Sequence, residues 1–237
     1  MEIIKNKNNK NAIDNKGIDT RFNYNFEDYI INNEQNTIYR FCFFDNFKSY
    51  QKCVCKIQTR INNSYNFGTG FFCYFPIREI RVLITNNHNI DQNFLDNEKE
   101  LIIYLEENGK QQKKIIELTS KRYKKTNIKL DITIIEIIEE DLIDDFFEID
   151  ENLIKNEDFI NEPVFNFQFY KGQYLSISFG KILGKNTENL RALVYNAGAD
   201  EGSSGSPIIL INTIKIIGFH KGVLGEELGT KLNLGYI

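Results

Sequence analysis

The sequence predicts an all-β fold, a sandwich or a barrel, and three observations support this prediction. Short runs rich in β-branched and aromatic residues follow one another from about residue 38 onward. Turn signals such as Asn108-Gly109, Lys171-Gly172 and Gly184-Lys185 lie between several of these runs. The pattern lacks the long alternation of strands and helices that is typical of nucleotide-binding α/β folds.

The predicted strands fall into two groups, with an acidic stretch between them. The first group consists of the runs at residues 37–44, 52–60, 68–75, 78–86, 100–107, 113–120 and 130–138. The second group consists of the runs at residues 163–170, 174–183, 189–196, 206–212 and 213–222. The stretch EEDLIDDFFEIDENLIK at residues 139–155 has room for a short helix, and a loop is the alternative.

Length and charge restrict the classes of protein that this chain can belong to. Its 237 residues suffice for one large all-β domain or two small ones, and they can bury a core without disulfides or metals. The formal net charge is −4 and the pI is about 5.4. Such a chain has no electrostatic reason to bind nucleic acid or an anionic membrane. We interpret the short basic cluster at residues 121–125 as a solvated loop, and a phosphate site is the alternative.

The N-terminal residues 1–37 are rich in Asn and Lys and poor in apolar periodicity. Because such a segment buries too little surface to offset its ordering entropy, we expect a disordered or loosely docked tail before a folded domain at residues 38–237. The chain shows no secretory signal and no apolar run of the roughly 18 residues that span a membrane. We therefore expect a cytoplasmic protein.

The cysteines and histidines do not form a metal-binding pattern. The four cysteines lie in the first third of the chain, at Cys42, Cys53, Cys55 and Cys73. Without a secretory signal, reduced thiols are favoured over a disulfide framework, and one cross-strand pair remains open. The two histidines, His88 and His220, have no neighbouring ligands at metal spacing. We expect neither a metal nor another cofactor.

Three residues, each beside an apolar run, are candidates for a nucleophilic site. Ser204 lies in EGSSGSPIIL at residues 201–210, where small residues precede a buried strand and an ordinary tight turn is the alternative. His88 follows the run at residues 78–86, and a structural histidine is the alternative there. Asp131 opens a strongly apolar run, where a carboxylate is costly to bury without a partner; an exposed residue is the alternative. A serine needs such a base and an orienting carboxylate to act as a nucleophile.

The order of five short motifs resembles that of the chymotrypsin-fold serine peptidases. The motifs stand here as Gly68-Thr69-Gly70-Phe71, Thr85-Asn86-Asn87-His88, Asp131-Ile132-Thr133-Ile134-Ile135, Gly202-Ser203-Ser204-Gly205-Ser206-Pro207 and Ile217-Gly218-Phe219. The resemblance covers roughly residues 40–237. It implies two antiparallel six-stranded β-barrels, at about residues 38–140 and 160–237, with the active site at their interface.

The resemblance also implies an activity and a role for each candidate residue. The chain would be a serine endopeptidase that acts on polypeptides through an acyl-enzyme. Ser204 would be the nucleophile, His88 the general base, and Asp131 the residue that holds the imidazole in the useful tautomer. The backbone N–H groups of Gly202 and Ser204 would form the oxyanion hole.

Details of the motifs look more like the glutamyl endopeptidases and the HtrA-type proteases than the digestive trypsins. Ser203 stands where the trypsins have Asp, and Gly198 stands at their specificity position, six residues before the nucleophile. The stretch GFHKG resembles the G-I-H-x-G of the glutamyl endopeptidases, the branch closest in motif. In that branch the histidine lines the primary specificity pocket and receives an acidic side chain.

By this resemblance His220 would bind Glu at the residue before the cut, and Lys221 and Gly222 would pair with the substrate backbone. A core histidine at a strand end is the alternative for His220. Two acids, Asp200 and Glu201, lie close to the nucleophile in sequence, and we expect them to face solvent or the pocket rim. The chain stops at NLGYI, where the family usually continues into a C-terminal helix, so truncation is an open expectation.

Two other classes of function remain open from the sequence. A pseudoprotease would keep the fold and serve as a peptide-binding module, and a β-rich scaffold would carry the motifs by coincidence. The intact set of Ser204, His88 and Asp131 favours the peptidase over both. The oligomeric state is not predicted.

Overall fold

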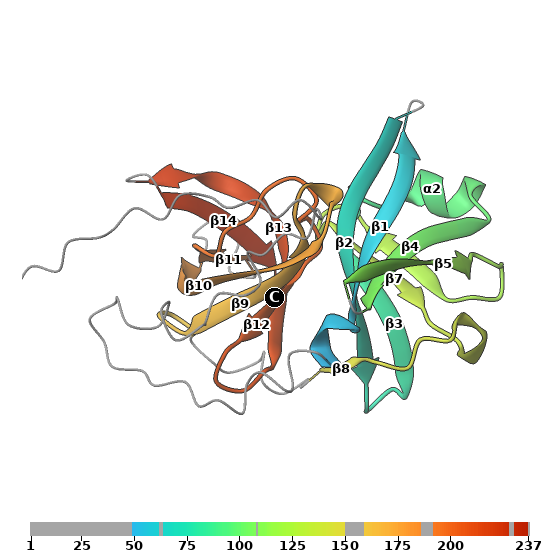
Figure 1. The fold of residues 1–237 in the computed structure, drawn as a ribbon, viewed down its shortest axis with the longest axis horizontal. Coiled ribbons are helices and arrows are strands. Elements are labelled where there is room, and N and C mark those ends of the chain that lie inside the picture. The colour runs from blue at the N-terminus through green and yellow to red at the C-terminus, as the bar shows by residue number, and fades with distance from the viewer. Residues whose placement is uncertain are drawn as a thin grey trace, which may run out of the picture. The chain divides into compact units, whose positions relative to one another are not determined.

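The computed structural model describes residues 49–61, 64–107, 109–149, 159–185, 192–227 and 230–236 (Figure 1). Within these ranges most residues lie in β-strands, which confirms the predicted all-β class. The strands form an N-terminal sheet and a C-terminal closed barrel. Both belong to one compact unit, Phe44–Ile237. The predicted strand at residues 37–44 lies outside the described residues.

The N-terminal sheet contains eight strands, and seven of them are hydrogen-bonded in the order β5-β4-β1-β2-β3-β7-β6. Every neighbouring pair along this order is antiparallel, whereas β8 pairs in parallel with β2. The bounds are Val54–Ile61 for β1, Ser64–Phe75 for β2, Ile80–Thr85 for β3, Glu100–Glu107 for β4, Lys110–Glu117 for β5, Lys124–Asn127 for β6, Ile132–Glu136 for β7 and Phe147–Glu148 for β8.

Strand alternation decides which side chains of this sheet reach its core. In β1, Cys55 and Ile57 belong to the buried apolar cluster, together with Phe72, Leu83, Leu101 and Ile103 of neighbouring strands. Because successive side chains of a strand point to opposite faces, Lys56 lies on the other face. Lys56 is directly opposite Thr69 of β2 and Tyr104 of β4 in the strand register. This second face carries contacts to the C-terminal barrel.

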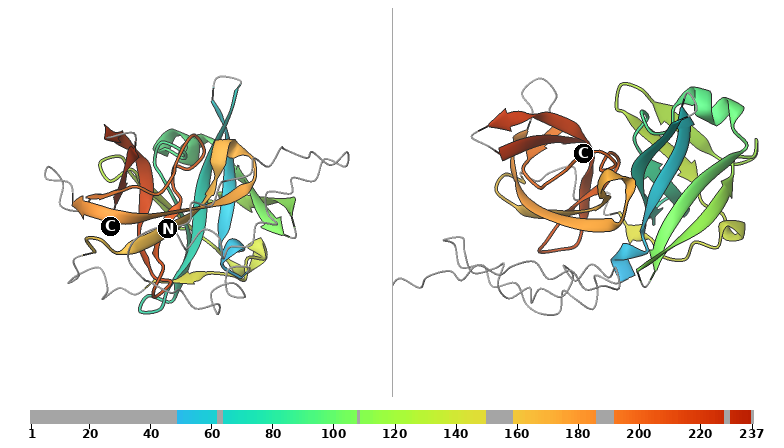
Figure 2. Two further views of the ribbon diagram at one scale, coloured as in Figure 1. Left: turned by 60° about the vertical axis from the view of Figure 1, so that its left-hand side comes forward. Right: turned by 45° about the horizontal axis from the view of Figure 1, so that its top comes forward.

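The C-terminal barrel closes with six strands, as predicted, in the order β10-β11-β14-β13-β12-β9. The bounds are Pro163–Phe169 for β9, Leu175–Lys185 for β10, Ala192–Tyr195 for β11, Pro207–Leu210 for β12, Ile216–Glu227 for β13 and Thr230–Tyr236 for β14. Its buried cluster is Phe159, Val164, Ile182, Leu193, Tyr195, Ala197, Ile208, Leu210 and Ile217. The right-hand view of Figure 2 shows the orange and red strands of this barrel beside the N-terminal sheet.

Several short elements differ from the sequence prediction. Strands β6 and β14 were not predicted. Strand β6 consists of Lys, Thr and Asn and therefore gives no apolar signal. Helix α2, Gln92–Asn97, was also missed; the side chain of Asp91 caps it by accepting a hydrogen bond from the backbone N–H of Phe94 at 2.8 Å. The acidic stretch forms the 3-10 turn η3, Glu139–Asp141, and β8, joined by a loop, and its last residues, 150–155, lie outside the described residues.

The prediction of a solvated loop at residues 121–125 is only partly correct: Lys121, Tyr123 and Lys125 are exposed, but Arg122 is buried and the cluster runs into a strand. Arg122 is 6% exposed and forms two hydrogen bonds with the carboxylate of Asp141, which is 9% exposed, at 2.5 and 2.9 Å. Its Nη1 also donates to the backbone carbonyl of Glu136 at 2.7 Å. Two parallel N–H···O bonds suit the planar guanidinium, and they join the start of β6 to η3. Residues Lys124 and Lys125 lie in β6 itself.

Three cysteines, Cys53, Cys55 and Cys73, are buried and free, as expected. Burial raises the pKa of Cys53 to about 12 and raises the pKa of Cys73 well above its ordinary value. These thiols therefore stay protonated and act as small apolar side chains. Cys42 lies outside the described residues. None of the helices in the described ranges has the length and apolar composition to cross a bilayer.

Candidate active site

His88 and Asp131 form a paired imidazole and carboxylate. His88 Nδ1 lies 2.8 Å from Asp131 Oδ2, and the backbone N–H of His88 donates to Asp131 Oδ1 at 3.0 Å. A carboxylate accepts hydrogen bonds, so this contact favours the tautomer with the proton on Nδ1. The Asp131 side chain is 10% exposed and that of His88 is 46% exposed. Nε2 of His88 is therefore the nitrogen left with a lone pair to accept a proton.

The pairing of β3 with β7 brings these two residues together. In that register Thr85, the last residue of β3, is opposite Thr133, so the turn after β3 faces the turn before β7. Asp131 lies in the second turn with a φ of 49°, and its backbone carbonyl accepts a hydrogen bond from Asn86 Nδ2 at 3.0 Å. The left-handed backbone of Asp131 is tolerated by short polar residues. The amide of Asn86 holds the turn in place.

Ser204 lies in the loop between β11 and β12, where two glycines have left-handed backbones. The φ angles of Gly202 and Gly205 are 83° and 89°. A Cβ on Gly205 would lie 2.2 Å from the carbonyl oxygen of Thr69, and a Cβ on Gly202 would lie 2.3 Å from that of Phe169. These positions need glycine because both the backbone angle and the space exclude a side chain.

The loop that carries Ser204 docks on strand β2 and on the turn that contains His88. The carbonyl of Ser204 accepts hydrogen bonds from the backbone N–H of Thr69 and from Asn89 Nδ2, each at 2.9 Å. Asn89 follows His88 directly in the chain, so the residue next to the predicted base binds the backbone carbonyl of the predicted nucleophile. Gly68 leaves the space for this amide, because a Cβ there would lie 2.4 Å from Asn89 Cγ.

The hydrogen bonds of the described residues include none between Ser204 Oγ and His88. Asn89 and Thr69 thus hold the backbone of Ser204 beside the segment that carries His88, and the contact between the nucleophile and the base itself stays a prediction. In enzymes without substrate this bond is often long. Sequence reasoning missed Asn89, Asn86 and the hydroxyl of Thr69. Their signal was present in GTG and TNNHN, where polar residues follow or interrupt buried strands.

Ser203, the neighbour of the predicted nucleophile, has a structural role. It is fully buried, and its Oγ accepts a hydrogen bond from the backbone N–H of Asp200 at 3.0 Å. Its own N–H and C=O bond to Asp200 and Ser206, which closes the loop into a tight turn. By contrast, the backbone N–H groups of Gly202 and Ser204 donate to no acceptor among the described residues. These two groups are available to a ligand.

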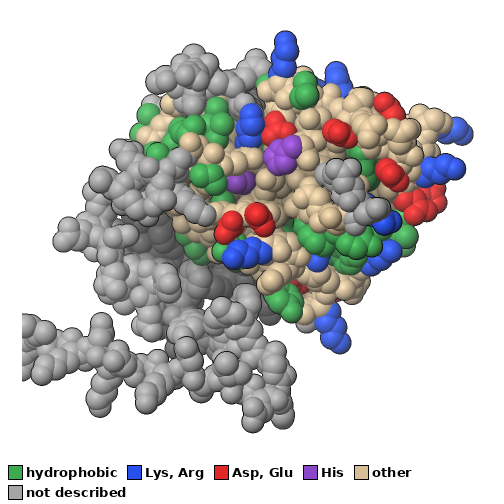
Figure 3. All heavy atoms as spheres, turned by 90° about the horizontal axis from the view of Figure 1, so that it is seen from above, with side chains coloured by type: hydrophobic (Ala, Val, Ile, Leu, Met, Phe, Trp, Pro, Cys, Tyr) green, Lys and Arg blue, Asp and Glu red, His purple; other side chains and the backbone are tan. Residues whose placement is uncertain are grey.

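His220, the predicted specificity residue, is 2% exposed at the centre of β13. Its Nδ1 lies 2.6 Å from the hydroxyl of Tyr195. Burial, followed by the charge of His88, lowers the pKa of His220 to about 4, so the imidazole is neutral near pH 7. Figure 3 shows histidine side chains close together on one face.

Tyr195 sets the tautomer of His220. Burial raises the pKa of Tyr195, so its hydroxyl keeps its proton. Asn166 Nδ2 donates to that hydroxyl at 3.4 Å, so the hydroxyl proton can go to His220 Nδ1. The ring proton of His220 then resides on Nε2, which makes no hydrogen bond within the described residues. A single neutral N–H donor is what His220 can offer to a ligand.

Buried amide side chains lie on the strands around His220. Two of them bind the backbone that leads to the predicted nucleophile: Gln168 Nε2 donates to the carbonyl of Gly198 at 2.9 Å, and Asn233 Nδ2 donates to that of Ala197. The amide oxygens of Asn166, Gln168 and Asn233 are buried without a partner in the described part of the chain. Gly198, at the trypsin specificity position, has only the Cβ of Ser178 within 4 Å of where its own Cβ would be.

The other predicted residues of this region are exposed or half-buried. Glu201 is exposed, as expected, and Asp200 is half-buried and accepts a hydrogen bond from the hydroxyl of Tyr170 at 3.0 Å. Lys221 and Gly222 are half-buried in β13, where the register with β14 shifts between His220 and Gly222. No atom lies within 4 Å of the position that a Cβ on Gly222 would occupy.

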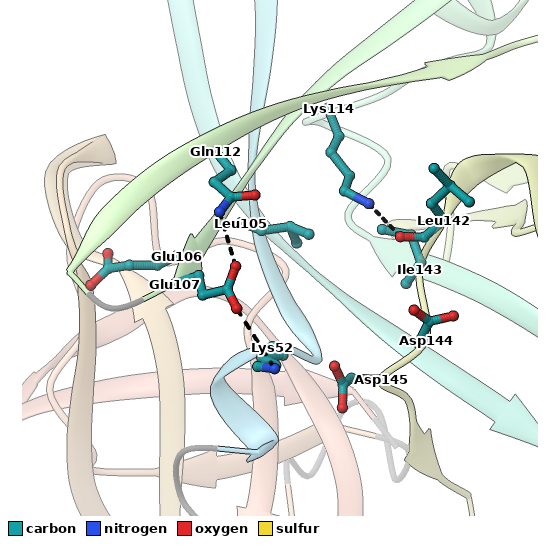
Figure 4. A pocket seen from close by; sticks show the side chains of 10 residues that line it. All are labelled: Lys52, Leu105, Glu106, Glu107, Gln112, Lys114, Leu142, Ile143, Asp144 and Asp145. Carbon is teal, nitrogen blue, oxygen red and sulfur yellow. Dashed lines mark hydrogen bonds and ion pairs between the residues drawn. The ribbon is translucent and has the colours of Figure 1, made fainter.

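A separate cavity of about 140 Å³ lies in the N-terminal half (Figure 4). It is lined by Lys52, Leu105, Glu106, Glu107, Gln112, Lys114, Leu142, Ile143, Asp144 and Asp145. Figure 4 shows the side chain of Glu106 pointing away from Lys52 and Glu107. None of the predicted catalytic or substrate-binding residues lines this cavity, so it is not the candidate active site.

No family model matches the chain, and no curated protein matches it. Solved structures do resemble it, among them a serine endoprotease from Yersinia pestis, with a TM-score of 0.60 and 14% identity over 84% of this chain and 64% of that one. The active form of the Rv3671c protease from M. tuberculosis aligns with a TM-score of 0.56 and 14% identity over 80% and 78%. The HtrA-type protease AlgW, solved with a tripeptide, aligns with a TM-score of 0.58 and 14% identity over 81% and 59%.

The chain thus spans less than two thirds of the Yersinia pestis and AlgW chains. These neighbours are HtrA-type and trypsin-like serine proteases, and the glutamyl endopeptidase branch receives no support from them. At such low identity the likeness shows the fold alone. The described chain therefore has the fold of the chymotrypsin-like serine proteases. Its C-terminal half is a closed six-stranded barrel, as predicted, whereas its N-terminal half is an eight-stranded sheet in place of the six strands predicted there.

Proposed function

We propose that this chain is a serine endopeptidase in which Ser204, His88 and Asp131 form the catalytic triad. The observation that supports this most is the bond between His88 Nδ1 and Asp131 Oδ2 beside the loop that carries Ser204. A structural histidine has no need of a carboxylate that is itself held by a left-handed turn and an amide. The alternatives of a coincidental turn and an exposed aspartate do not account for this arrangement.

In the proposed reaction Ser204 Oγ attacks the carbonyl carbon of the scissile peptide, and its proton passes to His88 Nε2. Asp131 stabilises the imidazolium that forms. The carbonyl oxygen becomes an oxyanion and accepts hydrogen bonds from the N–H groups of Gly202 and Ser204. The C–N bond then breaks, His88 returns the proton to the leaving amine, and an acyl-enzyme remains. Water, deprotonated by His88, hydrolyses this ester and regenerates Ser204.

We also propose that His220 contacts the side chain before the cut and that the enzyme prefers Glu there, and less strongly Gln or Asp. The neutral Nε2–H of His220 is one donor, and it serves a carboxylate or an amide oxygen. A buried carboxylate also favours protonation of a nearby imidazole, which adds charge to the contact. The substrate backbone would pair with β13 at Lys221 and Gly222, where open space surrounds Gly222.

Covalent labelling by a fluorophosphonate tests the nucleophile. The wild type should be labelled and should cleave unfolded polypeptides, and Ser204→Ala should lose both properties, a drop on the order of 10⁶ in turnover. Ser203→Ala is the matched control; since its Oγ is buried and bonded to the backbone, it should keep the label. Asp131→Asn should lower turnover by about 10⁴, because it disturbs the tautomer of His88. Labelling of Ser204→Ala would require another nucleophile.

The second candidate is a pseudoprotease that binds peptides without cleaving them. The observation that favours it is the lack of a hydrogen bond between Ser204 Oγ and His88 among the described residues. A folded wild type that resists labelling and hydrolyses no peptide, yet binds peptides, would establish this candidate and exclude the endopeptidase.

A peptide library tests the proposed preference. The wild type should enrich Glu before the cut, and His220→Leu should lose this preference while Ser204 is still labelled. Enrichment of Lys or Arg would contradict the proposal and point to Asp200 as the pocket charge. Indifference at this position would favour a broad, HtrA-type specificity.

A further inference from the structure

Lys56 is a nearly buried lysine, 8% exposed, on the face of the N-terminal sheet that is turned away from its core. Its Nζ donates to Gln111 Oε1 at 2.5 Å and to the backbone carbonyl of Gly172 at 3.2 Å. The same nitrogen lies 4.7 Å from the ring centroid of Tyr104 and 5.4 Å from that of Phe67. A charged amine is costly to bury without partners. One partner of this amine is the backbone carbonyl of Gly172, which belongs to the C-terminal barrel.

Gly172 belongs to a segment, residues 169–175, that we call the support loop. It joins β9 to β10 and contains the 3-10 turn η4, Tyr170–Gly172. Side chains of the N-terminal sheet bind its backbone at further points: Thr69 Oγ1 accepts from the N–H of Phe169 at 3.0 Å, Glu106 Oε2 accepts from that of Leu175 at 2.8 Å, and Gln111 Nε2 donates to the carbonyl of Gln173. Strand alternation and register place these residues on one face.

The support loop in turn holds residues 200–205, which we call the oxyanion loop. The N–H of Lys171 donates to the carbonyl of Glu201 at 2.6 Å. Gly202 packs so closely on the support loop that a Cβ would lie 2.3 Å from the carbonyl oxygen of Phe169 and 2.7 Å from the N of Gly172. A shift of Gly172 therefore moves the peptide group of Gly202, one of the two proposed oxyanion donors.

We propose that Lys56 is a positioning residue for the oxyanion hole, acting through the carbonyl of Gly172 and the support loop on Gly202. The expected effect of Lys56 on catalysis rests on the proposed function. Lys56 touches neither substrate nor nucleophile. It keeps the N–H of Gly202 at the point where the oxyanion forms, and misplacing an oxyanion donor lowers the rate of the chemical step more than it weakens substrate binding.

The kinetics of Lys56→Met test the inference, and Lys52→Met is the matched control. Lys52 is an exposed lysine that forms an ion pair with Glu107 at 3.9 Å. Methionine keeps much of the apolar stem and removes the amine. We expect kcat to fall by at least about tenfold with KM changed by less than about twofold. Lys56→Arg should recover most of kcat because it restores a charged donor. Lys52→Met should match the wild type. Wild-type kcat in Lys56→Met, or a change confined to KM, would overturn the inference.

Hydrogen exchange read by mass spectrometry separates the inference from the proposed function. In Lys56→Met the peptides that cover residues 169–175 and 200–205 should exchange faster, and in Lys52→Met they should not. Unchanged exchange overturns the inference whatever the activity. Faster exchange in a chain that cleaves nothing would instead support the positioning by Lys56 and contradict the endopeptidase. If Lys56→Met does not fold, Gly172→Ala tests the same path from the support loop to the oxyanion loop. A Cβ on residue 172 would lie 2.7 Å from Cβ of Phe67 and would displace the support loop.

Discussion

At the scale of single residues, two histidines of one chain acquire opposite chemistry from their surroundings. The side chain of His88 is 46% exposed and bonded to a carboxylate, whereas His220 is 2% exposed and bonded to a tyrosine hydroxyl. The first is suited to take up a proton during a reaction, and the second resists protonation. Proposed roles as base and as neutral donor follow from these surroundings.

The lowered pKa of His220 predicts a pH-dependent stability. In the unfolded chain this histidine titrates near 6.5, and in the folded chain its pKa is about 4. Between these values the unfolded state binds more protons, so the free energy of unfolding falls as the pH falls from about 6.5 to 4. The loss reaches at most about 3 kcal/mol. Urea unfolding of the wild type and His220→Gln at pH 7 and pH 4.5 measures it.

The difference in stability loss between the wild type and His220→Gln gives the contribution of His220 alone, because the carboxylates that also titrate in this range are the same in both proteins. His220→Gln should lose less stability on acidification than the wild type. Equal losses in both proteins would show that the imidazole titrates alike in the folded and unfolded chain.

At the scale of elements, the tight loop between β11 and β12 depends on glycine for two separate reasons. Gly205 has a φ of 89°, and a Cβ there would also meet Thr69 O at 2.2 Å and Thr85 Oγ1 at 2.6 Å. Gly109, in the turn between β4 and β5, has a φ of 72° but no atom within 4 Å of a Cβ. The two positions share the backbone strain and differ in the steric clash.

Alanine at these two glycines should therefore have unequal costs. Gly109→Ala should lower the free energy of unfolding by about 1 kcal/mol, through backbone strain alone. Gly205→Ala should lower it by at least about 3 kcal/mol, because the loop must also move away from β2. Denaturant unfolding of both variants measures the difference. Similar costs would mean that the loop yields easily and that its docking is loose.

At the scale of the whole molecule, the two halves of the fold are joined by polar side chains that converge near the candidate site. Thr69 is the most connected of them: its hydroxyl donates to the carbonyl of Gly202 at 2.6 Å and accepts from the N–H of Phe169 at 3.0 Å. Its backbone binds Ser204 on one side and the hydroxyl of Thr85 on the other. One residue of the N-terminal sheet thus contacts both the oxyanion loop and the support loop.

Thr69→Val keeps the shape of the side chain and removes its hydroxyl, so it measures what the two hydrogen bonds of that hydroxyl contribute. Valine leaves the carbonyl of Gly202 and the N–H of Phe169 buried without partners, which should cost about 1–3 kcal/mol of stability. The rate of fluorophosphonate labelling at Ser204 should fall as well, because the oxyanion loop loses a contact. Thr69→Ser keeps the hydroxyl and should stay near the wild type in both measurements. A stable, rapidly labelled Thr69→Val would mean that the two halves are held together elsewhere.

Most of the secondary structure could be predicted from local composition. Runs of β-branched and aromatic residues marked strands such as β4, Glu100–Glu107, and β9, Pro163–Phe169, because burial on a pleated sheet selects these residues. Strand β6, Lys124–Asn127, could not be found this way, since its polar side chains carry no apolar signal and its pairing with β7 is a tertiary contact. The candidate residues His88, Asp131 and Ser204 were likewise found from motif order.

Only the tertiary structure decided which of these side chains meet. The bond between His88 and Asp131 joins residues 43 positions apart and follows from the register of β3 with β7. The burial of Arg122, the amide of Asn89 on the carbonyl of Ser204, and the contact of Lys56 with Gly172 carry no local signal in the sequence. A buried hydrogen bond depends on where two distant segments lie in space, whereas a strand depends mainly on its own residues and their burial.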